Sequence, residues 1–404
     1  MTTLFPFRAL RPPAVLAERV ASPPYDVVST KEARALAGGN ADSFLRVSRP
    51  EIDLPEGIDE HADAVYAKGR DNLAELVRRG VLVADAEPRL YVYAQRMGEH
   101  RQTGLVACAA VDEYDKDLIK KHEKTRPDKE DDRVRHIDTL SAHDEPVFLT
   151  YRAVAAVDRA IDEVKRAAPT YDLVTPDGVG HQLWVVPAAA GEAITALFRS
   201  VPALYVADGH HRCAAASRVH ARRRGQPGEH GAFPVVVFPH DQVQILAYNR
   251  LVRDPAGRGP EALLAALREV FDIEPTGSAR PDEPLTFGVF VGGRWWRARV
   301  RPGSFDASDP VASLDCSIVQ EKLLAPLFGI ADIRTSKDVD FVGGIRGAEE
   351  LERRVKEENW SLGLYLFPTR VEQLIAVSDA GKLMPPKSTW FEPKLRSGLF
   401  AHAF

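Results

Sequence analysis

The sequence has little cysteine, no large excess of one charge and no long apolar run. Its 404 residues contain three cysteines, Cys108, Cys213 and Cys316, whose spacing and odd number argue against a disulfide framework or a cysteine zinc site. The 53 basic and 58 acidic side chains nearly cancel, so no global field attracts nucleic acid. No stretch approaches the roughly 18 apolar residues of a membrane span, and the first residues lack a signal pattern. We therefore expect a cytoplasmic protein with no membrane or nucleic-acid partner, in which any anion site is local.

The sequence does contain regular helix and strand patterns. Apolar residues recur at helical spacing over residues 58–80. The stretches "RLYVYAQR" and "TGLVACAAVDEY" predict a hairpin, and the Gly292-Gly293 pair predicts another. Because strands and helices mix without strict βαβ alternation, the predicted class is α+β. Proline and glycine cluster in "RDPAGRGPE", which predicts a domain boundary near residue 257 and a smaller α+β unit over residues 258–404.

The stretch "YVADGHHRCAAASRVHARRR", residues 205–224, joins a short buried strand to a helix expected to begin near His211. Its polar cluster then lies at a helix N-terminus, where unpaired N–H groups and the helix dipole favour an anion such as a phosphate. Gly209 lets a ligand approach the backbone closely. Asp208 has two interpretations, a cap of this helix or a functional carboxylate. Capping leaves three polar neighbours unexplained: His210, His211 and Arg212.

A second charged cluster, "KKHEKT", lies within residues 117–143, a stretch polar enough to be a solvated connector or to line a site. The residues of interest are Lys121, His122, Glu123, Lys124 and Thr125, followed by Arg133. Together the two clusters supply cations for phosphate oxygens, a carboxylate for Mg²⁺ and a base that orients a hydroxyl, the parts of a phosphoryl-transfer site. We therefore expect KKHEKT to close over phosphates bound at the helix N-terminus, although a separate charged surface loop would look similar.

Three shorter stretches carry polar pairs beside extended or strand-like chain. The pairs are Tyr25 and Asp26 in "SPPYDVVS", Asn249 and Arg250 in "AYNRLV", and Lys394 and Ser397 in "FEPKLRSGLF". Rigid packing explains the first pair as well as function does. The second pair can hold a ribose or a phosphate, or form a hydrogen-bond network at a strand end. The third pair can reach a site only if the C-terminal segment folds back.

Five stretches carry a resemblance to a known family. In chain order they are "SPPYDVVS", "KHEKTRPDKEDDRVRHI", "YVADGHHRCAAA", "AYNRLV" and "FEPKLRSGLF", and they resemble the bacterial and archaeal family called domain of unknown function 1015. The resemblance covers nearly the whole chain, but the family name conveys no chemistry. The DGHHR core is also similar to the D-G-x-H-R stretch of the ParB/sulfiredoxin-like fold, which includes free-serine kinases and nucleotide-binding partition proteins. This second resemblance implies a ParB-like nucleotide-binding core within residues 1–257.

The resemblance to the free-serine kinases also implies roles for individual residues. Asp208 and His211 would lie at the nucleotide phosphates and the metal, with Asp208 as the Mg²⁺ ligand. Glu123 would act on the substrate hydroxyl, although its surroundings in the sequence depart from the kinase pattern. The candidate nucleotide-binding and phosphate-binding residues are Gly209, His210, Arg212, Lys121, His122, Lys124, Thr125, Arg133, Asn249 and Arg250. The candidates for substrate contact or support are Tyr25, Asp26, Lys394 and Ser397.

Three functions fit these residues. The leading one is a small-molecule kinase that transfers a phosphoryl group from ATP or ADP, with Mg²⁺, to a hydroxyl acceptor such as free serine. The second is a nucleotide-binding regulator that hydrolyses its nucleotide slowly. The third is a metal-dependent hydrolase, for which no H-x-H or H-E-x-x-H spacing appears. Its ligands would be His122, His210, His211 and Asp208. The sequence leaves the oligomeric state open.

Overall fold

The computed structural model describes residues 2–404 and divides the chain into two compact units. The first unit contains residues 2–121, 125–243 and 393–404, and the second contains residues 122–124 and 244–392. The C-terminal segment, residues 393–404, therefore belongs to the first unit. The chain passes from the first unit to the second between residues 243 and 244. The predicted functional boundary near residue 257 stays a prediction.

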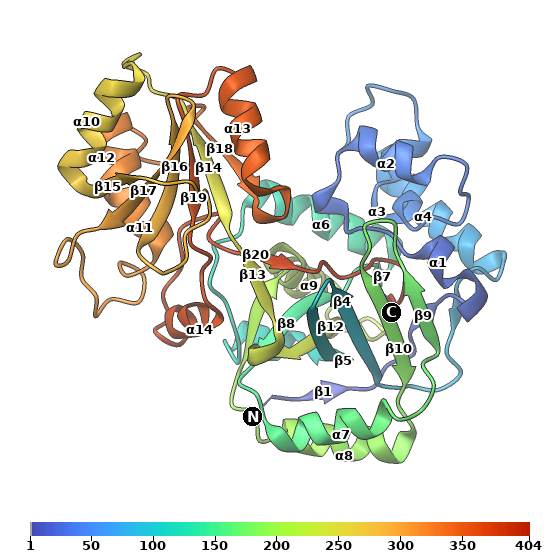
Figure 1. Cartoon of the computed structure of the whole chain (residues 1–404). Helices are drawn as coiled ribbons and strands as arrows, with labels where there is room; N and C mark the ends of the chain where they lie inside the picture. Colours follow the sequence, from blue (N-terminus) through green and yellow to red (C-terminus); the bar gives the residue numbers. More distant parts are fainter. Residues whose placement is uncertain (1) are drawn as a thin grey trace. The chain divides into compact units, whose positions relative to one another are not determined.

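A mixed nine-stranded sheet forms the centre of the first unit (Figure 1). Its strands are β1 Leu4–Phe5, β4 Tyr91–Met97, β5 His100–Ala110, β6 Ile119–Lys120, β8 Val147–Tyr151, β9 Tyr171–Val174, β10 Gly180–Val185, β11 Leu204–Asp208 and β12 Ala232–Pro239. Their order is β6-β11-β8-β12-β5-β4-β10-β9, and β1 pairs with β5. Strand β11 runs parallel to β6 but antiparallel to β8. The start of β8 therefore lies beside the end of β11, where the polar motif begins.

Helices and two short strand pairs complete the first unit. The helices are α1 Ala17–Val20, α2 Thr30–Ala37, α3 Leu45–Ser48, α4 Asp63–Arg78, α5 Val111–Asp115, α6 Pro127–Leu140, α7 Ala155–Val164, α8 Ala188–Phe198 and α9 His210–Arg222, with 3-10 turns at Ala14–Leu16, Tyr25–Val27, Pro50–Asp53 and His240–Gln242. The strand pairs are β2 Leu10–Arg11 with β3 Val83–Ala84, and β7 Ala142–His143 with β21 His402–Ala403. Strand β21 is the end of the C-terminal segment, so its pairing with β7 helps to fix that segment to the first unit.

The main hydrophobic core lies between this sheet and its helices. Apolar side chains of the central strands meet α7 and α8, which lie together in Figure 1. Helix α9 contributes Cys213 and Ala216 to this core. On α9, Ala215 and Val219 pack against Val134 and other side chains of α6. Small side chains let α9 pack closely on both sides, which fixes the position of its first turn at the end of β11.

An antiparallel six-stranded sheet forms the centre of the second unit. In spatial order its strands are β15 Phe271–Pro275, β17 Arg294–Val300, β16 Thr286–Val291, β19 Leu362–Leu366, β14 Tyr248–Val252 and β18 Val339–Gly343. Its helices are α10 Pro260–Val270, α11 Asp315–Val319, a π-helical turn at Gln320–Leu324, α12 Ala325–Phe328, a 3-10 turn at Gly344–Arg346, α13 Gly347–Glu357 and α14 Val371–Asp379. Strands β13 Gln244–Leu246 and β20 Trp390–Glu392 form a separate pair.

Several local predictions can be compared with these elements. Strands β4 and β5 form the predicted antiparallel hairpin, and so do β16 and β17. Both Gly292 and Gly293 have positive φ, 61° and 79°, as a tight hairpin turn requires. The interpretation of residues 117–143 as a solvated connector is wrong, because α6 lies within it and buries Val134, Ile137 and other side chains.

The broader predictions are confirmed in part. Strands and helices mix around a large mixed sheet and a second sheet, whereas the ParB-like identity of the core stays a prediction. All three cysteines are buried. Within residues 2–404, none of the helices combines the length and apolar character needed to cross a bilayer.

Candidate functional site

The predicted helix N-terminus forms where β11 ends. Helix α9 begins at His210, and the residue before its first turn is Gly209, whose φ of 104° is rarely adopted by residues with a side chain. Among residues 2–404, no side chain makes a capping hydrogen bond at this helix start. The interpretation of Asp208 as the cap is therefore wrong, and the capping position of α9 carries no side chain that would compete with an anion.

Asp208 pairs instead with a lysine of the C-terminal segment. Lys394 Nζ donates to Asp208 Oδ2 at 2.8 Å, and the two side chains are 16% and 27% exposed. The main chain of Lys394 is held in place because its carbonyl accepts a hydrogen bond from Gln95 Nε2 at 2.8 Å. Burial alone would raise the pKa of Asp208, but Lys394 and Arg212 together hold it well below its ordinary value. Asp208 is therefore ionised at neutral pH, the state in which a carboxylate binds a divalent cation.

Arg212 lies directly beneath the glycine loop. A Cβ atom placed on Gly209 would come within 3.1 Å of Arg212 Nε. The buried guanidinium donates to the carbonyl of Pro146, and its Nη1 lies 3.6 Å from Glu145 Oε2. This arginine, predicted to contact phosphates, thus also holds the loop and the chain before β8 in place.

The sequence analysis missed Glu145, which lies at the centre of the cluster. Strand β8 pairs antiparallel with β11, with Phe148 opposite Asp208, so the residues just before β8 come beside the end of β11. Glu145 Oε1 accepts hydrogen bonds from the Tyr25 N–H at 3.1 Å and from the Ser397 hydroxyl at 2.7 Å. An acidic pair directly before an apolar strand was visible in the sequence. Only the antiparallel pairing of β8 with β11 shows that this acidic pair lies beside the end of β11.

The environment of Glu145 makes it easy to protonate. Burial raises its pKa to about 7, even though Arg212 acts in the opposite direction. The nearby carboxylates Asp144 and Asp26 add to the increase. Glu145 is therefore a buried acid that exchanges its proton near neutral pH.

Stability at different pH values tests this environment. The pKa of Glu145 is about 7 in the folded protein against an ordinary value of 4.5, so its contribution to stability is full below pH 4.5 and is lost as the pH rises through 7. Glu145→Gln keeps an acceptor for Tyr25 and Ser397, and it should remove about 3 kcal/mol of pH dependence from the free energy of unfolding. Urea denaturation of both proteins between pH 4.5 and 8 measures this difference. Parallel curves would contradict the assigned environment.

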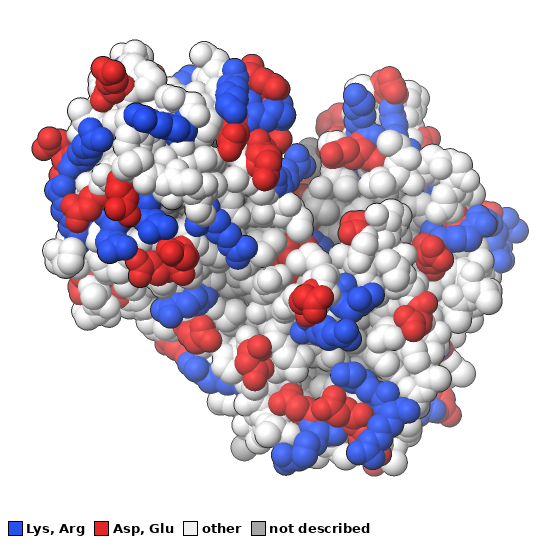
Figure 2. All heavy atoms as spheres, viewed as in Figure 1, with Lys and Arg blue, Asp and Glu red and all other residues white. Residues whose placement is uncertain are grey.

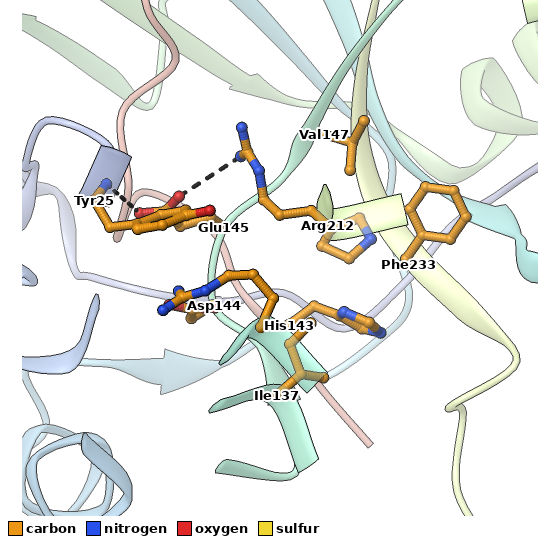
Figure 3. Close-up of a pocket in the computed structure, with 10 residues that line it drawn as sticks. Tyr25, Ile137, His143, Asp144, Glu145, Val147, Arg212 and Phe233 are labelled. Carbon is orange, nitrogen blue, oxygen red and sulfur yellow. Dashed lines mark hydrogen bonds and ion pairs between the residues drawn. The ribbon is translucent and has the colours of Figure 1, made fainter. Parts of the chain in front are cut away.

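Two small pockets share Glu145 and Arg212 as lining residues. The first also contains Tyr25, Arg133 and Asp144, several of which Figure 3 labels. Arg133 stacks over the Tyr25 ring, with its guanidinium carbon 3.9 Å from the ring centre. The second adds three residues, Asp208, Lys394 and Ser397. The structure thus brings six of the predicted residues together in the first unit from stretches far apart in the sequence: Tyr25, Arg133, Asp208, Arg212, Lys394 and Ser397. The exposed Asp26 adds its charge beside them.

The two histidines of the motif differ in their surroundings. His211 Nε2 accepts a hydrogen bond from the N–H of Arg126 at 3.1 Å, which links the start of α6 to the start of α9. Burial lowers the pKa of His211, so at neutral pH its ring is neutral, with the proton on Nδ1. His211 therefore offers a ligand a hydrogen-bond donor rather than a positive charge. His210 is buried.

The KKHEKT residues are divided between the two units. Lys121 and Thr125 belong to the first unit, whereas residues 122–124 belong to the second. Lys121 Nζ lies 4.1 Å from the centre of the Tyr114 ring. The predicted role of Glu123 as a base, and the predicted closure of this stretch over phosphates, stay predictions.

Asn249 and Arg250 bind the backbone of their own unit. Asn249 Oδ1 accepts the N–H of Leu366 at 3.1 Å. Arg250 donates to the carbonyl of Tyr248 and, at 2.8 Å, to that of Lys387. Both side chains are buried, so the observed contacts form a strand-end network. Their predicted contact with a nucleotide stays a prediction.

Charge is mixed over the visible surface. Figure 2 shows Lys and Arg side chains interspersed with Asp and Glu over the face in view. The formal net charge is -5. Attraction of an anion therefore depends on local groups such as those at the start of α9.

Comparisons with known proteins give one family and several distant structures. The profile of the family described as "Protein of unknown function (DUF1015)" matches residues 4–317. A free serine kinase in complex with AMP is 11% identical, over 73% of this chain and 92% of that chain, with a TM-score of 0.38. SbnI with a C-terminal truncation, from Staphylococcus aureus, is 14% identical over 74% and 87%, with a TM-score of 0.39. These values establish neither a shared fold nor a shared activity. No curated protein matches the sequence.

Proposed function

Because the chain belongs to the DUF1015 family, as its five stretches predict, and the description of that family states no reaction, we propose a function from the site itself. The protein is a small-molecule kinase with a ParB-like core, in which ATP or ADP donates a phosphoryl group to a hydroxyl acceptor. Free serine is the first acceptor to test. The observation that carries the proposal is the ionised Asp208, held beside Lys394 and directly before the uncapped start of α9. An ammonium group and helix N–H groups suit the negative charge of a phosphoryl group, and a carboxylate in the same place can hold the Mg²⁺ that accompanies it.

The residues of the first unit fit a magnesium ion. Protein sites hold Mg²⁺ through one or two carboxylates together with phosphate oxygens, and Asp208 supplies one ionised carboxylate. When bound, Mg²⁺ would neutralise charge on the phosphates. The ammonium of Lys394, released from Asp208, would bind a phosphate oxygen, while Arg212 adds positive charge beneath the loop.

The second unit supplies the remaining proposed roles. Glu123 is the proposed base that orients the acceptor hydroxyl. The proposed nucleotide contacts from this unit are His122, Lys124, Asn249 and Arg250. Glu123→Gln should lower turnover while leaving the affinity for nucleotide unchanged, because a base acts on the hydroxyl and not on the donor. Equal rates for the variant and the wild type would remove Glu123 from the reaction.

Binding and product analysis test the function in two steps. The melting temperature should rise with ATP or ADP in the presence of Mg²⁺, because a ligand of the folded state stabilises it. CTP serves as the comparison nucleotide. Phosphorus NMR with a panel of hydroxyl compounds that includes serine should then reveal a phosphorylated product. Nucleotide binding with slow hydrolysis and no transfer to any acceptor would favour the regulator.

One contact bears on the hydrolase alternative. A metal-binding imidazole uses an unprotonated nitrogen, and in His211 this atom, Nε2, already accepts the Arg126 N–H. This hydrogen bond counts against His211 as a ligand of the hydrolase, and the nucleotide-binding regulator is the second candidate. The regulator is favoured by the ion pair between Lys394 and Asp208, because this pair occupies the carboxylate that phosphoryl transfer would need for Mg²⁺.

A further inference from the structure

Glu145 is a buried carboxylate to which the proposed reaction assigns no role. Its Oε1 accepts both of the hydrogen bonds that Glu145 receives, from Tyr25 and Ser397. Its Oε2 has no hydrogen-bond partner among residues 2–404 and lies 3.6 Å from Arg212 Nη1. The side chain is 2% exposed. Figure 3 shows the carboxylate between the Tyr25 backbone and the Arg212 guanidinium.

Arg212 connects this carboxylate to the anion site. Its guanidinium faces Glu145 and lies beneath Gly209, at the start of α9. A phosphate bound at the start of α9 would place a second anion beside the same buried guanidinium. Two anions close together in a buried place repel, and the weaker acid of the two takes up a proton.

We propose that Glu145 is the resident counter-anion of Arg212 and that it takes up one proton from solvent when a phosphate or similar anion binds at the start of α9. This inference rests on the proposed function, because it requires an anion site there. The proton goes to Oε2, the oxygen without a hydrogen bond, while Oε1 keeps its two donors. Glu145 is then a neutral acid whose O–H can donate a hydrogen bond, and the positive charge of Arg212 is free for the ligand.

The other titratable groups around Glu145 are consistent with the uptake of a proton by Glu145. Those that line its two pockets or affect its pKa are Tyr25, Asp26, Arg133, His143, Asp144, Asp208, Arg212, Lys394 and Arg396. Asp26 and Asp144 favour protonation of Glu145. Burial lowers the pKa of His143 to about 3, so this ring does not take up the proton near neutral pH. Asp208 stays ionised because its pKa is far below the ordinary value. Glu145, with a pKa of about 7, takes up a proton at little cost.

Proton uptake can be measured with sulfate as the probe. Sulfate is fully ionised near neutral pH, so any proton taken up on its binding goes to the protein. Titration calorimetry above pH 7 in two buffers of different ionisation enthalpy should give an uptake approaching one proton per sulfate bound. The affinity of the wild type should fall by up to about tenfold per pH unit above 7, the limit for one linked proton.

A matched pair of variants assigns the proton. Glu145→Gln should bind sulfate without this proton uptake and with an affinity that no longer falls above pH 7. Glu163→Gln, which removes an exposed carboxylate paired with Arg166 at 2.8 Å in the same unit, should behave as the wild type. Uptake that persists in Glu145→Gln would overturn the proposal. If this variant fails to fold, sulfate binding to the wild type without proton uptake would overturn it equally.

The proposed function fails in a different way. If neither sulfate, phosphate nor ATP binds the folded wild type at any pH, the anion site itself is absent and both proposals fall. If these ligands bind with no proton linked to Glu145, only the coupling falls and the kinase proposal stands.

Discussion

Asp208→Asn should lower the rate of phosphoryl transfer by orders of magnitude. Asparagine has a similar shape but carries no charge for Mg²⁺, and it cannot balance the Lys394 ammonium. The loss of this charged hydrogen bond should also cost about 1.5–3 kcal/mol of stability. Turnover under saturating nucleotide and acceptor, compared with the free energy of unfolding, separates the two effects.

A second Asp–Lys pair in the same unit provides the control. Asp162, on α7, has its Oδ1 atom 3.3 Å from Nζ of Lys165, the residue that follows this helix, and the Asp162 side chain is 71% exposed. Asp162→Asn should leave turnover unchanged, because Asp162 is not part of the proposed site. It should also change the free energy of unfolding little, because exposed ion pairs contribute little to stability. Nearly normal transfer by Asp208→Asn would end the kinase proposal and leave the nucleotide-binding regulator as the better one.

Gly209→Ala should destabilise the protein by about 2–5 kcal/mol and weaken nucleotide binding. The φ of 104° at Gly209 is unfavourable for alanine, and a left-handed backbone costs about 1–2 kcal/mol by itself. The new methyl group would also lie 3.1 Å from Arg212 Nε. Arg212 cannot move away without losing its contacts with Glu145 and Pro146, so overpacking adds about 1–3 kcal/mol.

Gly225 separates these two costs. It lies just after α9 with a φ of 84°, and in the described part of the chain no atom other than those of its two sequence neighbours lies within 4 Å of the position of its Cβ. Gly225→Ala should therefore cost only the backbone contribution, about 1–2 kcal/mol. Urea denaturation of both variants gives the comparison. An equal loss of stability in the two would mean that the close approach to Arg212 contributes nothing.

The sequence predicted those features that depend on neighbouring residues. Both hairpins follow from alternating side chains with short turns, and the start of α9 follows from a buried strand that ends at Asp208 and Gly209. The role of Asp208 was left between two interpretations. Capping depends on the direction of one side chain, and that direction is set by Lys394, which is far away in the chain.

The role of Glu145 depends even more on residues that are distant in the sequence. Asp and Glu side chains are mostly exposed in proteins, so two of them before an apolar strand do not distinguish Glu145 from a solvated carboxylate. The antiparallel pairing of β8 with β11 brings it beside the end of β11. Burial then raises its pKa, and Arg212, in the first turn of α9, becomes its partner.

By itself, the sequence determined the family, the mixed strand and helix composition, and the strand-to-helix junction with its polar residues. These three features depend on amino-acid composition, on periodicity and on short motifs, all of which can be read from neighbouring residues. Only the tertiary structure decided that residues 393–404 belong to the first unit, that Lys394 neutralises Asp208 and that Glu145 faces Arg212. Ion pairs between distant segments depend on strand register and on the return of the chain. Coulomb attraction requires only that the charges come close in space, and no local pattern records this.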